Sequence, residues 1–200
     1  MIISNYHKQG GIPMQWTIPG TVLPVNMEES GSIEQRLGAM FLGGGIVLSQ
    51  VAAITGLEPY TVQNWVKRGF LTPPVAKKYT LRQLCRIIII NMLKDALPME
   101  DICGLISYVN GQLDDEADDL IDDSRLYFLF IRLASMHRQM NNAEGRDQVL
   151  EQVLVDYAEP IPGAKKRVEA VLKVMLTAWS AGLLRQQACA MTAALKEAKK

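Results

Sequence analysis

The stretch LSQVAAITGLEPYTVQNWVKRGFL, residues 48–71, decides the fold of this 200-residue chain. Its apolar residues recur at helical spacing in two short runs, 48–55 and 58–68. Gly56 lies between the runs, where a left-handed backbone can end the first helix at little cost. Pro59 suits the first turn of the second helix. The stretch therefore predicts two short helices joined by a tight turn.

Two helices joined in this way are typical of the helix-turn-helix, whose second helix lies in the major groove of DNA. The predicted second helix has a polar side made of Thr61, Gln63 and Asn64. The amides of Gln63 and Asn64 can read adenine edges through paired hydrogen bonds. Lys67 and Arg68, at the end of the helix, suit phosphate contacts. The alternative is that the two amides are only solvated.

The segment 70–79 contains Pro73-Pro74, so it is not helical, and we expect an extended loop or a two-stranded hairpin. Polar side chains in and just after it suit the same DNA surface: Lys77, Lys78, Tyr79 and Arg82.

The formal net charge is zero, but the charges are unevenly distributed. Residues 60–94 contain seven bases and no acid, whereas residues 95–123 contain ten acids and no base. A block of one sign in a neutral chain is the electrostatic pattern expected of a nucleic-acid-binding module.

The acidic run 114–119 lacks the ligand spacing and the glycine of a calcium-binding loop. We interpret it as part of a solvated linker. The last acids of this linker, Asp122 and Asp123, favour the N-terminus of a following helix.

The fold class predicted for the whole chain is mainly α. It consists of a winged helix-turn-helix, with three to four helices and a short wing, followed by a C-terminal helical bundle. A capping box at Thr80 opens a helix to about residue 96, and the final helix begins near residue 163. The predicted regions are an N-terminal arm with a short helix that packs on the body (1–46), the winged helix-turn-helix (47–111), the acidic linker (112–123) and the helical domain (124–200).

Catalytic and metal-binding motifs are missing from the sequence. It has two histidines, His7 and His137, and neither has an acidic residue at helical spacing; no phosphate-binding glycine loop occurs. The three cysteines are widely spaced, which predicts buried small side chains in a reduced protein. No apolar run is long enough to span a membrane or to form a signal peptide. We therefore expect a cytoplasmic protein that is not an enzyme and has no cofactor or metal.

Residues 48–57 and 61–71 resemble the MerR-type winged helix-turn-helix, in which the second part reads T-L-R-Y-Y-E-R-x-G-L-L. Residues 67–94, Leu97 and residues 16–19 are similar to a group of uncharacterised bacterial proteins known only as a domain of unknown function. The MerR resemblance implies a wing at 72–79 along the DNA backbone, a homodimer on a two-fold operator and a role in transcription regulation. Two positions depart from the family: Gln63 stands where it has Arg, and Asn64 where it has its first Tyr.

Three function hypotheses remain open. The first is a sequence-specific regulator that binds double-stranded DNA as a homodimer, with a small-molecule effector left open. The second is a protein-protein interaction module on the same scaffold. The third is a small helical enzyme, for which the sequence offers no convergent titratable groups. The acid-free basic block favours the first, because protein interaction alone does not require it.

Overall fold

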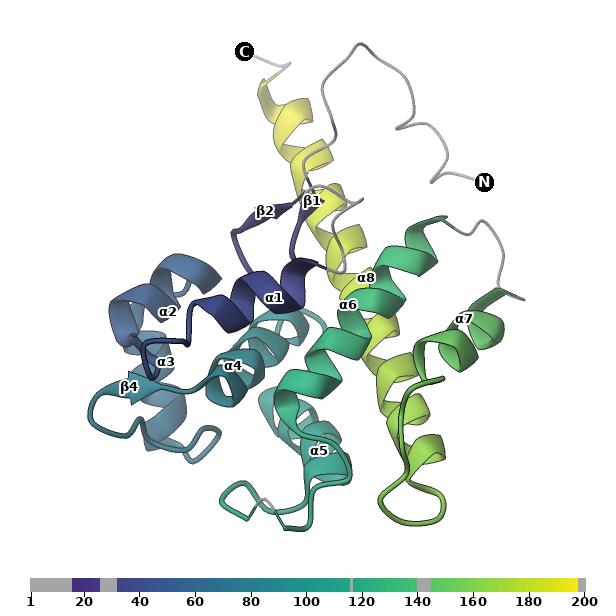
Figure 1. The fold of residues 1–200 in the computed structure, drawn as a ribbon. Coiled ribbons are helices and arrows are strands. Elements are labelled where there is room, and N and C mark those ends of the chain that lie inside the picture. Colours follow the sequence, from purple (N-terminus) through teal and green to yellow (C-terminus); the bar gives the residue numbers. More distant parts are fainter. Residues whose placement is uncertain (1–15, 26–31, 116, 140–144, 198–200) are drawn as a thin grey trace.

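The computed structural model describes residues 16–25, 32–115, 117–139 and 145–197. The described chain is mainly helical, as predicted, and four short strands form two antiparallel pairs (Figure 1). The helices are α1 (Ser32–Ala39), α2 (Leu48–Thr55), α3 (Pro59–Lys67), α4 (Leu81–Leu93), α5 (Met99–Asn110), α6 (Asp123–Gln139), α7 (Gly145–Val153) and α8 (Ala164–Glu197). The strands are β1 (Trp16–Thr17), paired with β2 (Pro24–Val25), and β3 (Ile46–Val47), paired with β4 (Lys78–Tyr79).

Helix α4 lies at the centre of the fold. Every side chain from Leu84 to Ile90 is buried. A helix covered on one side buries only a stripe, so burial of seven consecutive residues requires cover on several sides. Helices α2, α5, α6 and α8 all pack against α4. One hydrophobic core therefore contains residues from both the predicted DNA-binding region and the predicted C-terminal region.

The start of α4 follows the predicted capping box. The hydroxyl of Thr80 accepts a hydrogen bond from the backbone N–H of Gln83 at 3.2 Å. In return, the side-chain oxygen of Gln83 accepts one from the N–H of Thr80 at 2.9 Å. These two bonds satisfy donors that the first turn of a helix leaves unpaired.

The described part of the N-terminal arm packs on the core, as predicted. Ile18 and Val25 are buried. The hydroxyl of Tyr127 in α6 donates to the carbonyl of Pro19 at 2.7 Å. The amide of Asn91 in α4 donates to the carbonyl of Gly20 at 3.0 Å. The arm is thus fixed to two helices. Residues 1–15, which include His7, lie outside the described residues.

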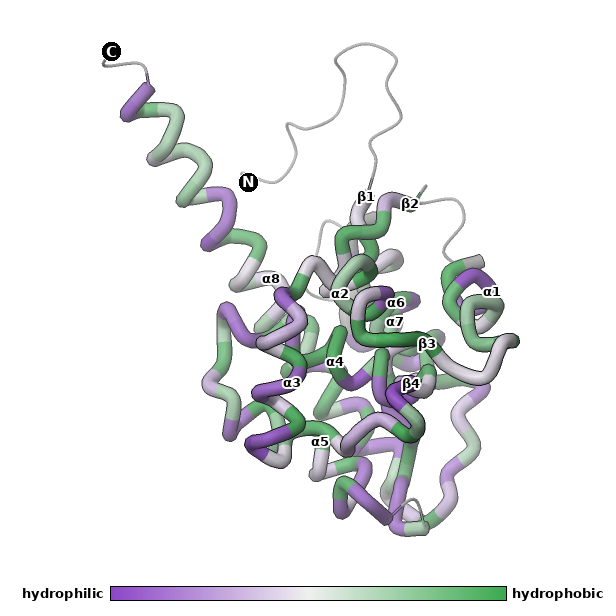
Figure 2. Tube along the Cα trace, turned by 90° about the vertical axis from the view of Figure 1, so that its left-hand side faces the viewer, coloured by the Kyte–Doolittle hydropathy of each residue, from purple (hydrophilic) through white to green (hydrophobic). Residues whose placement is uncertain are grey.

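Helix α8 is buried on one side only as far as Gly182, and its C-terminal part projects away from the other helices (Figure 2). Leu183, at the start of the projecting part, is exposed. One sequence prediction is corrected here. Cys189, expected to be buried, is exposed as well, while Cys85 is buried and Cys103 is half-buried.

Candidate nucleic-acid interface

Helix α3 presents a polar surface because its apolar residues hold it against the core. Val62 and Trp65 are buried, and α3 packs on α2. Tyr60, Gln63 and Lys67 follow one another at helical spacing on the other side, and all three are exposed. This row contains two of the residues predicted to contact DNA.

A second row of predicted residues lies beside the first. Thr61 and Asn64 are half-buried, and Arg68 follows at the end of the helix. The guanidinium carbon of Arg68 lies 4.7 Å from the centre of the Phe70 ring. One of its nitrogens lies 3.7 Å from a carboxylate oxygen of Glu100. These contacts restrain the Arg68 side chain, half of whose surface remains accessible.

Tyr60 is a candidate that the sequence reasoning missed. Its side chain is 75% exposed, and it stands in the same row as Gln63 and Lys67. The sequence could have indicated Tyr60, because it is three residues before Gln63 and seven before Lys67, which places all three on one side of a helix. An exposed tyrosine hydroxyl can contact a phosphate or a base edge.

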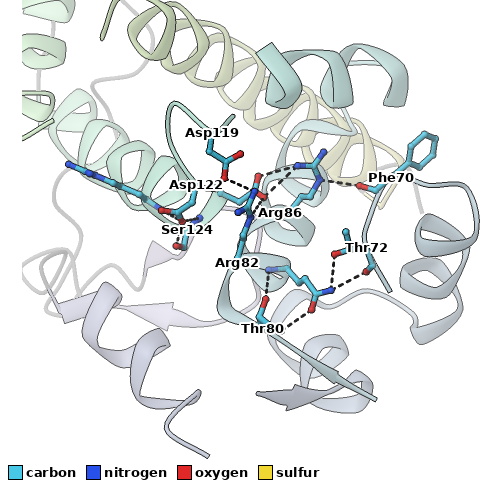
Figure 3. Close-up of polar contacts among 11 residues, drawn as sticks. Phe70, Thr72, Thr80, Arg82, Arg86, Asp119, Asp122 and Ser124 are labelled. Carbon is cyan, nitrogen blue, oxygen red and sulfur yellow. Dashed lines mark hydrogen bonds and ion pairs between the residues drawn. The ribbon is translucent and has the colours of Figure 1, made fainter. Parts of the chain in front are cut away.

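The loop that follows α3 is fixed at its base by a second missed residue, Gln83. Its side-chain nitrogen donates to the hydroxyl of Thr72 at 2.9 Å and to the carbonyl of Thr72 at 3.1 Å (Figure 3). It also donates to the carbonyl of Pro73 at 3.1 Å. In the sequence, Gln83 is the third residue after Thr80 and completes the predicted capping box. The structure adds a role in holding the predicted wing.

The tip of this loop is a tight turn that ends in two lysines. The backbone N–H of Lys78 donates to the carbonyl of Val75 at 2.9 Å. Ala76 and Lys77, between them, have φ values of 49° and 63°, the left-handed region that costs non-glycine residues energy. Lys77 is exposed at the tip, and the amine of Lys78 donates to the carbonyl of Gly43 at 3.2 Å.

Strand pairing places the loop beside the two helices. Ile46 pairs with Tyr79 and Val47 with Lys78, and β3 runs directly into α2. The loop also follows α3 in the chain. The lysine-tipped loop is therefore attached to both helices of the α2–α3 pair, at the end of the molecule marked by β4 in Figure 1.

Tyr79 is not part of this surface, contrary to the sequence prediction. It is 3% exposed, and burial raises the pKa of its hydroxyl. The cause is the alternation of side chains along a strand: Lys78 points outward, so Tyr79 points into the core.

Arg82, predicted to contact phosphate, is instead held by acids of the segment between α5 and α6. Its guanidinium lies 2.7 Å from a carboxylate oxygen of Asp119 and 3.5 Å from one of Asp123. Only 20% of its side chain is exposed. Arg86, one turn along α4, lies 3.4 Å from Asp123 and donates to the carbonyl of Phe70 at 3.1 Å (Figure 3).

The prediction of a solvated acidic linker is therefore wrong for Asp119 and Asp123, which are largely buried against α4. Asp123 nevertheless lies in the first turn of α6, at the helix start predicted for it. Burial raises the pKa of Asp119 to about 6, although the Arg82 charge opposes the shift. Its second oxygen has no hydrogen-bond partner among the described residues. Burial raises the pKa of Asp123 as well, against the charges of Arg86 and Arg82.

Asp122 takes the helix-start role predicted for it. One of its carboxylate oxygens accepts hydrogen bonds from the backbone N–H groups of Ser124 at 2.8 Å and Arg125 at 3.1 Å. These groups belong to the first turn of α6, where a negative charge is also favourable.

Within the described ranges, no group of three or more His, Cys, Asp or Glu side chains is arranged to hold a metal ion. None of the described helices combines the length and the apolarity needed to cross a membrane.

Comparison with known proteins found one similar protein and one family model that match part of this chain. An uncharacterised protein, YkrK of Bacillus subtilis (strain 168), is 28% identical over 86 residues. That match spans 41% of this chain and only 37% of the relative's length. No solved structure matches the chain. The family model described as a domain of unknown function, DUF1836, matches residues 47–130, from β3 into α6. The matched region contains the α2–α3 pair, the loop and the acids that hold Arg82 and Arg86.

Proposed function

We propose that the protein is a sequence-specific DNA-binding regulator that acts as a homodimer in the cytoplasm. In this proposal residues 47–111 form a winged helix-turn-helix, with α3 in the major groove and the loop 72–79 along the backbone. The observation that carries the proposal is α3 itself. Its apolar side chains fix it on the core and leave the row Tyr60, Gln63 and Lys67 exposed, with the half-buried Thr61 and Asn64 beside it.

The residues divide by chemistry into two groups. Gln63 and Asn64 offer amides that match adenine edges, and Thr61 offers a hydroxyl beside them. The phosphate-binding group is Lys67, Arg68, Lys77 and Lys78, with Tyr60 added. Tyr79 and Arg82 are left out, because one is buried and the other is paired with acids.

The pairing of Arg82 with Asp119 and Asp123 removes one of the five bases predicted to contact phosphate, and the expected salt dependence follows from those that are left. Four bases per subunit remain for phosphate, so a homodimer offers eight contacts. Each contact releases a counterion, which predicts a slope of about −7 for the logarithm of the binding constant against the logarithm of salt concentration.

The test selects bound sequences from a random duplex pool and then measures affinity for the selected duplex at several salt concentrations. The proposal expects an enriched two-fold sequence and a steep negative slope. If no sequence is enriched and no duplex is shifted by the folded protein, the DNA proposal fails, and the interaction-module alternative takes its place.

Variants separate the two groups of residues. Lys77→Ala should weaken binding to all duplexes by a similar factor and reduce the steepness of the salt slope by about 2 in a dimer. Gln63→Ala should relax the preference at one base position, with a loss of about 1–3 kcal/mol on the selected duplex. Lys166→Ala, an exposed lysine on α8, is the matched control and should change neither. Equal effects of all three variants would contradict the assignment.

A further inference from the structure

The projecting part of α8 carries large apolar side chains that this chain leaves exposed. Leu184, Met191 and Leu195 are 58%, 62% and 68% exposed. They do not belong to the buried side of the helix, which ends at Gly182. Figure 2 shows this end of α8 extending beyond the other described elements. Exposed apolar groups at regular spacing on one helix mark an interaction surface.

These side chains belong to a longer series with the spacing of a coiled coil. Steps of three and four residues alternate through it, so all its members lie on one face of the helix. Each member is exposed. We call this series the α8 seam: Val174, Thr177, Ala181, Leu184, Ala188, Met191 and Leu195.

The charge along the seam is low. Between Val174 and Leu195 the only charged residue is Arg185. Its guanidinium lies 2.8 Å from a carboxylate oxygen of Asp95, so this charge is paired within the chain. A partner with a neutral apolar face meets no unpaired charge here, whereas a strongly charged partner finds no counter-charge.

We propose that the α8 seam binds the α8 seam of a second copy of this chain, with the two helices antiparallel. The residue sizes support this arrangement. When Leu184 faces the partner's Ala188, Ala181 faces the partner's Met191, and Thr177 faces the partner's Leu195. The two-fold axis repeats each pair, which makes six layers.

Each of these layers combines one small and one large side chain, the combination that fills a helix interface without voids. A parallel dimer would instead place Ala181 against the partner's Ala181 and Ala188 against the partner's Ala188. Those layers would leave gaps between the helices, and gaps in a core are destabilising. The sequence of the seam is thus complementary to itself in the antiparallel direction.

This inference rests on the proposed function for its homodimer, but the interface contains none of the α3 or loop residues, so dimerisation and DNA binding can fail separately. Its test is sedimentation of the full chain without DNA at micromolar concentrations. Wild type should sediment as a dimer. Leu184→Glu and Met191→Glu each place a carboxylate in the seam and should weaken dimerisation at least 100-fold. Ala193→Glu, exposed on the opposite side of the same helix, is the matched control and should remain dimeric. Unchanged circular dichroism must show that all three variants fold.

The register has its own test. Ala188→Lys alone should also be monomeric, but a mixture of the Leu184→Glu and Ala188→Lys proteins should recover a heterodimer, because the two new charges face each other. Spin labels at Ala194→Cys, with Cys103 and Cys189 replaced by alanine, report the direction. Antiparallel helices separate the labels by about 24 Å along the axis, whereas parallel helices bring them to about 10 Å.

The proposal is overturned by a monomeric wild type, by a dimer that survives both seam variants, or by the short label distance. If the wild type is monomeric, binding of neutral lipid vesicles that both seam variants abolish would identify a membrane as the occupant instead. None of these outcomes depends on whether DNA binds.

Discussion

Gly20 and Gly56 adopt backbone conformations that disfavour any side chain. Both have positive φ, and a Cβ on Gly20 would lie 2.5 Å from the backbone oxygen of Ile88. We expect Gly20→Ala to destabilise the fold by about 3 kcal/mol, because left-handed strain and overpacking add. Gly56→Ala, whose Cβ would meet the movable side chain of Val22, should cost less. Urea unfolding measures both.

The control for these variants is Gly104→Ala. Gly104 lies inside α5, and a Cβ there meets nothing within 4 Å. Alanine should stabilise the helix by about 0.5–1 kcal/mol. A loss of stability at Gly104, equal to that at Gly20, would show that steric contact is not the cause.

Asp119 predicts a stability that decreases as pH rises. Its pKa is raised from 3.8 to about 6 in the folded protein. The folded state therefore holds a proton that the unfolded state releases at lower pH. Its contribution is complete below about pH 4 and is lost as pH rises through about 6. Asp119→Asn removes this titration, so the variant should gain stability relative to wild type between pH 4.5 and 7.

Unfolding free energies of the two proteins at several pH values measure this difference. A constant difference across the range would contradict the raised pKa. Chemical-shift titration of the Asp119 carboxyl is an independent check on the midpoint.

For single residues, the sequence predicts which side chains are exposed where helical periodicity alone determines it. It places Gln63 and Lys67 on the exposed side of α3, and the structure agrees. It fails for Arg82, because the acid that holds it is 37 positions away and periodicity carries no information on that distance. It fails for Tyr79, because a two-residue strand is too short to show an alternating pattern.

The junction of α4 and α6 depends on a buried ion pair. Arg86 and Asp123 are both almost fully buried, and their side chains approach to 3.4 Å. Arg86→Met should destabilise the protein by up to about 3–5 kcal/mol, because it leaves the buried carboxylate of Asp123 with the Arg82 guanidinium alone, at 3.5 Å. The double variant Arg86→Met/Asp123→Leu should recover most of that loss.

Chemical denaturation of wild type, both single variants and the double variant gives the coupling energy. Additive losses would show that the two side chains do not interact. The matched surface comparison is Lys173→Met, whose exposed pairs with Asp147 and Glu169 should contribute less than about 1 kcal/mol.

The start and end of a helix can be predicted closely from the sequence, whereas the helices that pack against it cannot. The capping box at Thr80 and the glycine at 56 give the correct start of α4 and end of α2. The four isoleucines from Ile87 to Ile90 have no amphipathic pattern, so the sequence cannot show that α8 and α6 cover the sides that α2 and α5 leave open. That information depends on helices that follow α4 by 30 to 100 positions.

The whole chain should unfold in one transition. Because α4 is shared by every part of the core, a fragment of residues 1–111, which holds the whole predicted DNA-binding region, loses the cover of α6 and α8. We expect this fragment to lack a cooperative thermal transition, while the full chain shows one. Circular dichroism at 222 nm during heating measures both. A fragment that melts sharply would show that residues 1–111 form an independent domain.

The central place of α4 also has a consequence for synthesis on the ribosome. The four isoleucines emerge early, yet α8, which covers them, begins more than 70 residues later. At about 5–20 residues per second, they remain uncovered for several seconds. During that interval the nascent chain exposes an apolar helix to solvent. Chaperones should therefore bind mainly to the segment around Ile87–Ile90 until α8 packs against it.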